Sequence, residues 1–324
     1  MQEWFRGKIS DATVLDLSVE VYRKKLKSII GYQILFTIIM ILLFVVGMFV
    51  IVPMITWITL EGAGGLFSFV VFVVIMIILL GTLMGMNKAG IFYMVYSYIN
   101  GENLCASEGV GKAFSSFKQV FRLVCAFSIC VLPILIILGL GGMTVTTITL
   151  WQSKMASSTL TAILIGGVLF SVVSAILGSY LFYSLHIAIF DHEKGFASMK
   201  KSIQFAKGEV LRNAFRVFSI FIFEWGVSIS FYSAIAAISA LVYFLLGKVA
   251  GGESIITQIM LWGDKLKVPL DFILGILLAP MSSIIWTFYY MNMKYKKEGL
   301  KIHNMMDELE EEEELPKSID IHYE

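Results

Sequence analysis

Glu224 is the only ionisable side chain expected deep inside an apolar run of this 324-residue sequence. At ~1.5 Å per helical residue it lies about 12 Å beyond Arg216, where the preceding polar segment ends. A charge at that depth costs a few kcal/mol on insertion scales, so the side chain should face the interior of a helix bundle. Two interpretations stay open. The carboxyl is either a proton, cation or substrate contact, or a structural group, protonated or hydrogen-bonded to Ser228 one turn further on.

A basic cluster just before that run supplies the second group of candidates. The segment 197–207 is basic and amphipathic, Gly208 breaks it, and 209–216 continues it. Its cations could bind the headgroups of anionic lipids, each worth about 1 kcal/mol near the membrane surface. Their role in setting membrane topology explains them equally well. The five residues are Lys200, Lys201, Lys207, Arg212 and Arg216.

Enzyme chemistry finds little support in the residues. The sequence has no Gly-Lys-Ser/Thr phosphate loop, no His-Glu-x-x-His, no Cys-x-x-Cys and no Gly-x-Ser-x-Gly, which argues against an ATPase, a zinc protease and a serine hydrolase. The three cysteines give no disulfide framework. We therefore expect a non-enzymatic protein with no catalytic residue, no metal and no cofactor.

The elements that position these residues are long apolar segments. The chain is 58% hydrophobic and only 15% charged, a composition that a soluble surface could not hydrate. About 20 apolar residues cross the hydrocarbon core as a helix. The sequence therefore predicts an all-α, multi-pass membrane protein with six spans, at residues 29–53, 66–86, 120–140, 160–186, 217–246 and 268–293.

The charges predict the orientation of these spans. Of the 25 Lys and Arg residues, 21 fall on one side of the six spans and 4 on the other. The positive-inside rule then places both termini in the cytoplasm, in the cell membrane. The net charge of +1 gives no reason to expect nucleic acid as a partner.

Amphipathic segments on the cytoplasmic side precede the spans. Residues 1–28 include a helix with an apolar stripe, which lies either in the headgroup boundary or against the bundle. The stripe consists of Leu15, Val19, Tyr22, Leu26 and Ile29. Together with hydropathy, such segments suggest a threefold hairpin repeat at 10–98, 112–190 and 197–293, although positive-inside bias alone would also produce this pattern. The tail 294–324 contains the acidic run Glu310–Glu314 and is predicted to be solvated and disordered.

Small residues predict close helix contacts. Gly81 and Gly85 are four apart on the second span, and the fourth span has a seam of small residues. Packing within the bundle is the first interpretation, and a dimer interface is the alternative. The seam consists of Gly167, Ser171, Ser174 and Gly178.

Two short segments resemble a known family. The first is Ser202 followed by Lys207-Gly208-Glu209-Val210-Leu211-Arg212, and the second is Tyr290-Met291-Asn292-Met293-Lys294-Tyr295-Lys296-Lys297-Glu298-Gly299. They are similar to segments of the bacterial six-span membrane domain that is fused to some glycerophosphodiester phosphodiesterases. The chain departs from that pattern at Asn292, where the family has an acid, and at Met291, where it has a tyrosine.

The resemblance implies a membrane domain rather than the phosphodiesterase activity, which belongs to a separate soluble barrel in the fused enzymes. The first functional hypothesis is an organiser or modulator at the cytoplasmic membrane surface that acts through anionic lipids. The alternative is a transporter, or a subunit of one, with Glu224 in a polar path framed by Pro133 and Pro280. Membrane lipids, another membrane protein or a second copy are the expected partners. Polar groups converging on Glu224 in a cavity would favour the transporter, and a dry, packed bundle the organiser.

Overall fold

The computed structural model describes residues 11–60, 65–130, 133, 173, 175–250 and 253–297. This part of the chain is helical and contains no strand. The labelled helices are α1 (Asp11–Leu60), α2 (Gly65–Ile99), α3 (Ala106–Ser115), α6 (Ser184–Phe190), α7 (Gly195–Ala206), α8 (Val210–Ala250) and α9 (Glu253–Lys297). A further helix, Phe117–Cys130, follows α3.

Four helices in the described residues are long and apolar enough to cross a membrane: Ala12–Ile58, Phe67–Ile99, Val210–Val242 and Pro269–Lys297. A fifth crossing is possible if α3 and Phe117–Cys130, which meet at a 53° bend, form one broken span. The prediction of an all-α protein with several apolar helices is confirmed. The predicted spans 120–140 and 160–186 are only partly within the described residues, so the count of six remains a prediction.

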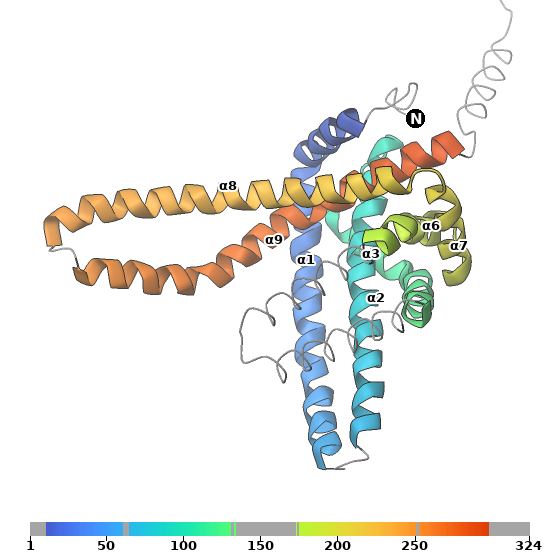
Figure 1. Ribbon diagram of the computed structural model, residues 1–324, viewed down its shortest axis with the longest axis horizontal. Coiled ribbons are helices and arrows are strands. Elements are labelled where there is room, and N and C mark those ends of the chain that lie inside the picture. The colour runs from blue at the N-terminus through green and yellow to red at the C-terminus, as the bar shows by residue number, and fades with distance from the viewer. Residues whose placement is uncertain are drawn as a thin grey trace, which may run out of the picture.

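Two long hairpins diverge from a common helical junction (Figure 1). The pair α1–α2 points one way and the pair α8–α9 another, while α3, α6 and α7 surround the junction. The main core lies at this junction and is rich in aromatic side chains, among them Tyr32, Phe36, Phe92, Tyr183, Tyr289 and Tyr290. The most apolar stretches of α1, α2 and α8 are almost unburied by protein, as expected for surfaces that face lipid.

The N-terminal segment is continuous with the first span rather than a separate surface helix. Its buried side chains are Val14, Ser18 and Val21, whereas Val19 and Leu26 of the predicted stripe are exposed. Ser18 fits the buried face because its hydroxyl donates a 2.7 Å hydrogen bond to the carbonyl of Val14. Helix α1 therefore packs against the junction and still presents an apolar face outward.

Helix α2 also runs further than predicted. The predicted span ends at residue 86, but residues 88–99 continue the helix and bury Ala89, Ile91, Phe92, Met94, Val95 and Ile99. The predicted end was too early because Lys88 interrupts a sequence that is otherwise mostly apolar.

Glycines allow close packing along α2. A Cβ on Gly85 would lie 2.5 Å from a methyl carbon of Val120, and one on Gly81 would lie 3.1 Å from Val124. Both neighbours belong to helix Phe117–Cys130, so this pair of glycines packs within the chain, as in the first interpretation. Gly178 has open space at its Cβ position, and Gly167, Ser171 and Ser174 lie outside the described residues.

Candidate functional site

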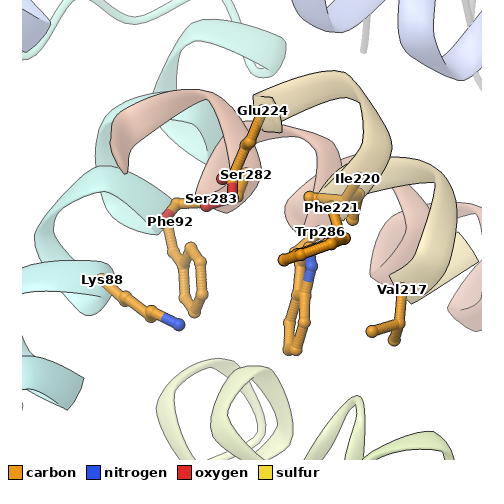
Figure 2. Close-up of a pocket in the computed structure, with 9 residues that line it drawn as sticks. All are labelled: Lys88, Phe92, Val217, Ile220, Phe221, Glu224, Ser282, Ser283 and Trp286. Atoms are coloured by element: carbon orange, nitrogen blue, oxygen red, sulfur yellow. The ribbon is translucent and has the colours of Figure 1, made fainter. Parts of the chain in front are cut away.

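A cavity of about 230 Å³ lies between α2, α8 and α9. Figure 2 shows its lining side chains. The polar groups are Lys88 from α2, Glu224 from α8, and Ser282 and Ser283 from α9. The apolar walls are Phe92, Val217, Ile220, Phe221 and Trp286. Glu224, the predicted intramembrane candidate, is thus part of a polar cavity.

Helical spacing explains how each element presents its residues to this cavity. On α8 the lining residues are at positions 217, 220, 221 and 224, which is one helical face. Lys88 and Phe92 are one turn apart on α2, and Trp286 follows Ser282 by one turn on α9. Three helices therefore direct charged, hydroxyl and aromatic side chains, which are far apart in the sequence, into one space.

Lys88, which is exposed, and Glu224, which is half-buried, line the same cavity but do not form an ion pair. The ammonium of Lys88 lies 5.4 Å from the ring centroid of Trp286, and it donates no hydrogen bond to any residue in the described ranges. The Ser228 hydroxyl donates to the backbone carbonyl of Glu224 at 2.8 Å, not to the carboxylate. The proposed structural bond from Ser228 to the Glu224 side chain is therefore absent.

Two buried polar side chains close to the cavity lack partners within the described residues. Ser283 is 3% exposed, lines the cavity, and its hydroxyl has no hydrogen-bond partner. His186 is fully buried, and neither ring nitrogen has one. Its ring stacks on Phe92, with centroids 3.9 Å apart, and on Tyr290 at 5.0 Å. Unsatisfied buried polar groups are rare in folded proteins, so the Ser283 hydroxyl is available to a molecule in the cavity, water included.

A buried polar cluster lies beside the cavity, closer to the start of α8. Arg216 is 5% exposed and donates to the Tyr183 hydroxyl at 3.1 Å and to Asn213 Oδ1 at 3.0 Å. The Tyr183 hydroxyl also donates to Asn213 Oδ1 at 2.9 Å. The Arg216 guanidinium lies 4.7 Å from the Tyr289 ring centroid. The cluster joins the segment before α6 to α8 and α9.

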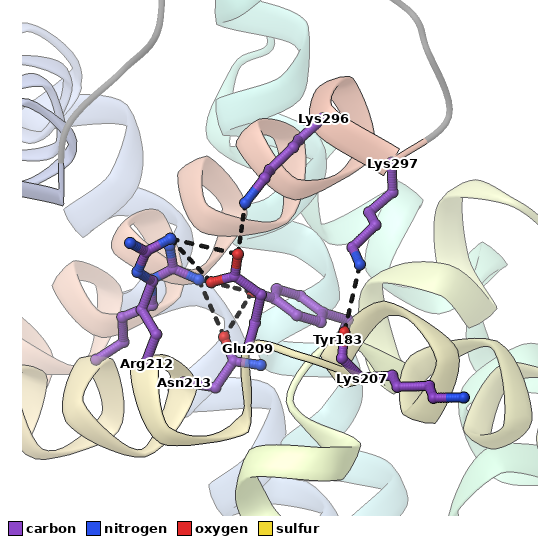
Figure 3. A network of polar contacts seen from close by, with 8 residues as sticks. Tyr183, Lys207, Glu209, Arg212, Asn213, Lys296 and Lys297 are labelled. Carbon is purple, nitrogen blue, oxygen red and sulfur yellow. Dashed lines mark hydrogen bonds and ion pairs between the residues drawn. The ribbon is translucent and has the colours of Figure 1, made fainter.

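A surface network ties the start of α8 to the end of α9 (Figure 3). The Glu209 carboxylate pairs with Arg212 at 3.0 Å and with Lys296 at 2.5 Å. Lys297 donates to the backbone carbonyl of Lys207 at 3.3 Å. Between them Gly208 has a φ of +84°, a backbone conformation that glycine adopts without strain. The two segments that carry the family resemblance thus contact each other directly.

Asp191, at the end of α6, forms a second link to α9. Its carboxylate pairs with Lys201 at 2.6 Å and Lys294 at 2.5 Å, and accepts a 3.1 Å hydrogen bond from Tyr290. Burial alone would raise the pKa of Asp191, but the hydrogen bonds and charges of the two lysines outweigh it and lower the pKa. The pKa of Glu209 is lowered in the same way, by Lys296 and Arg212 against the opposing effect of burial.

This link predicts an acid-sensitive contribution to stability. Because the folded-state pKa of Asp191 lies below that of an unfolded aspartate, its contribution is complete above the unfolded value and lost as pH falls through the folded value. Asp191→Asn should lower the free energy of unfolding by about 1–2 kcal/mol at pH 7. In acid the variant and the wild type should converge. Unfolding in detergent across this pH range measures the difference.

The matched control is Glu193→Gln, two residues away, where the side chain is exposed and makes no ion pair within the described residues. This variant should match the wild type at every pH. An Asp191→Asn deficit that persisted unchanged in acid would contradict the assignment.

The predicted lipid-binding cations have different surroundings. Lys200 and Lys207 are exposed, Lys201 is paired with Asp191, and Arg212 is paired with Glu209. Arg216 is buried and cannot reach a lipid headgroup from the surface. Sequence reasoning placed Lys88 with the lipid-facing cations rather than in one cavity with Glu224, and it missed Ser282, Ser283 and Trp286. The one available signal was a lysine inside the apolar stretch that continues to Ile99.

These observations define a membrane protein that is helical throughout its described residues, with several apolar helices and a cavity that four polar residues line. A family model described as the membrane domain of glycerophosphoryl diester phosphodiesterase matches residues 153–322, just over half of the chain. The chain belongs to this family. A search of curated proteins and a search of solved structures gave no match.

Proposed function

We propose that this protein is a non-enzymatic membrane protein of transport type that binds a small polar ligand between α2, α8 and α9. The observation that carries the proposal is one cavity containing the opposite charges of Lys88 and Glu224 without an ion pair between them. Glu224 is half-buried in an apolar helix and has no ion-pair partner among the described residues, and a charge held inside the membrane costs a few kcal/mol, so a purely structural bundle gains nothing from it. Polar groups converging on Glu224 favour the transporter hypothesis over a dry scaffold.

The size of the cavity supports a small ligand. Its volume of about 230 Å³ is below the ~300–1,000 Å³ of pockets for drug-sized molecules. It suits a small solute or a single lipid headgroup. With both termini in the cytoplasm and six spans, as the charges and hydropathy predict, Lys88 would lie near the cytoplasmic boundary and Glu224 deeper in the bilayer. The cavity would then open toward the inner leaflet.

Thiol accessibility tests this proposal. The three native cysteines, Cys105, Cys125 and Cys130, are first replaced, and Ser282→Cys is introduced in that background. In inside-out membrane vesicles, a membrane-impermeant thiol reagent should label Ser282→Cys, because the residue lines a cavity that exchanges ligand with water on the cytoplasmic side. Ile222→Cys, which is 53% exposed on the outer surface of α8, should face lipid and stay unlabelled. Equal failure of both positions to react would count against the proposal.

A second function, organisation of the membrane surface through anionic lipids, is supported by one face of α7. Phe196, Lys200, Ile203 and Lys207 are exposed and recur at helical spacing, with Phe196 57% and Ile203 45% exposed. Apolar side chains flanked by lysines are typical of helices that lie in the headgroup region. If this function dominates, Lys200→Gln combined with Lys207→Gln should abolish binding of the protein to anionic lipid headgroups. Lys88→Gln should leave this binding intact.

A further inference from the structure

We infer that the cavity ligand is a zwitterion, with its anionic group facing Lys88 and its cationic group facing Glu224. This inference rests on the proposed function and names its ligand class. The Lys88 ammonium has no anionic partner and the Glu224 carboxylate no cationic partner among the described residues, although both side chains line the same cavity. A ligand that carries both charges would satisfy both groups at once.

Charge balance excludes the simpler ligands. A plain anion would pair with Lys88 but would be repelled by the nearby Glu224 carboxylate. A plain cation would pair with Glu224 but would be repelled by the Lys88 ammonium. A molecule whose two charges are a few bonds apart fits between two protein charges that do not reach each other.

Ser283 supplies an independent observation. Its buried hydroxyl lines the same cavity and has no partner within the described residues. A hydroxyl can donate to an anionic group or accept from an ammonium group. Either bond to the ligand would satisfy the hydroxyl, and an apolar ligand would not.

Three probes of one length test the charge requirement. The purified full-length protein, in nanodiscs of phosphatidylglycerol, is titrated with 4-aminobutyrate, butyrate and butylamine, with binding followed by calorimetry. The zwitterion should bind at least tenfold more tightly than either singly charged probe. Ser283→Ala should weaken zwitterion binding severalfold. Equal affinities for all three probes would overturn the inference.

Two variants should change this preference in opposite directions. In Lys88→Gln the advantage of 4-aminobutyrate over butylamine should disappear, and in Glu224→Gln its advantage over butyrate should disappear. Glu193→Gln, whose exposed side chain lies outside the cavity, should retain the wild-type order. Unchanged preferences in both cavity variants would also overturn the inference.

The same chemistry could come from a free solute or from a phosphatidylethanolamine headgroup, and a second nanodisc composition separates the two. If the lipid is the natural source, discs that contain phosphatidylethanolamine should block 4-aminobutyrate binding. If a free solute is the source, the affinity should be equal in both discs. If Ser282→Cys is labelled but only a singly charged probe binds, the zwitterion inference is refuted and the proposed function stands. If Ser282→Cys is not labelled, both the inference and the proposed function are refuted.

Discussion

Gly195→Ala should strongly destabilise the protein. Gly195 is the buried first residue of α7, and a Cβ there would lie 2.3 Å from the backbone oxygen of Arg122 and 2.8 Å from its carbonyl carbon. Both obstacles are main-chain atoms of a neighbouring helix, so no rotamer change relieves the overlap. Helix α7 would have to move away from helix Phe117–Cys130, which we expect to cost about 3 kcal/mol or more. Size-exclusion chromatography in detergent and thermal unfolding measure the loss.

The matched control is Gly226→Ala in the middle of α8, where a Cβ would meet nothing within 4 Å. Alanine is favoured over glycine inside a helix by about 0.5–1 kcal/mol, so this variant should fold as well as the wild type or better. A Gly195→Ala protein that unfolded at the wild-type temperature would show that α7 does not rest on Arg122.

Apolar length was sufficient to predict the helices that carry the fold. The runs 29–53, 66–86, 217–246 and 268–293 all lie within long helices of the described residues. Their ends were harder to predict, because a helix can leave the bilayer and continue into a packed junction. Lys88 illustrates this point: its ammonium packs over Trp286 while α2 continues beyond it.

Of the four polar residues that line the cavity, only Glu224 was predicted from sequence as an intramembrane site residue. Glu224 stood out because a carboxyl in an apolar run is costly wherever it lies. Ser282 and Ser283 did not, since small hydroxyls are common in membrane helices and satisfy themselves on their own backbone. Ser283 is distinctive only because its hydroxyl has no partner among the described residues, and only the tertiary structure reveals this.

The basic cluster shows the same limit. Arg212 and Arg216 are one turn apart on α8 and look equivalent in sequence, as two cations before an apolar run. The side chain of Arg212 is 55% exposed, whereas Arg216 is 5% exposed and surrounded by Tyr183, Asn213 and Tyr289. Segments far apart in the sequence create this difference, so no local pattern could reveal it. Their roles should differ accordingly.

Arg216→Ala should therefore destabilise the protein far more than Arg212→Ala. The buried variant loses two charged hydrogen bonds, to Tyr183 and Asn213, and the contact with the Tyr289 ring. Hydrogen bonds to charged groups contribute about 1.5–3 kcal/mol each, so a loss of about 3 kcal/mol is expected. Arg212→Ala removes an exposed pair with Glu209 and should cost about 0–1 kcal/mol. Thermal unfolding of both variants in the same detergent makes the comparison.

Arg216→Lys separates geometry from charge at this position. A lysine keeps the positive charge but lacks the planar fork that donates to Tyr183 and Asn213 from one nitrogen and stacks on Tyr289. We expect it to recover less than half of the stability lost in Arg216→Ala. Full recovery would mean that charge alone is required, and equal stability of Arg216→Ala and Arg212→Ala would show that Arg216 does not join α8 to α9. The intermediate result would establish this cluster as the link that holds the cavity helices together, because α8 and α9 supply Glu224, Ser282 and Ser283 to one space.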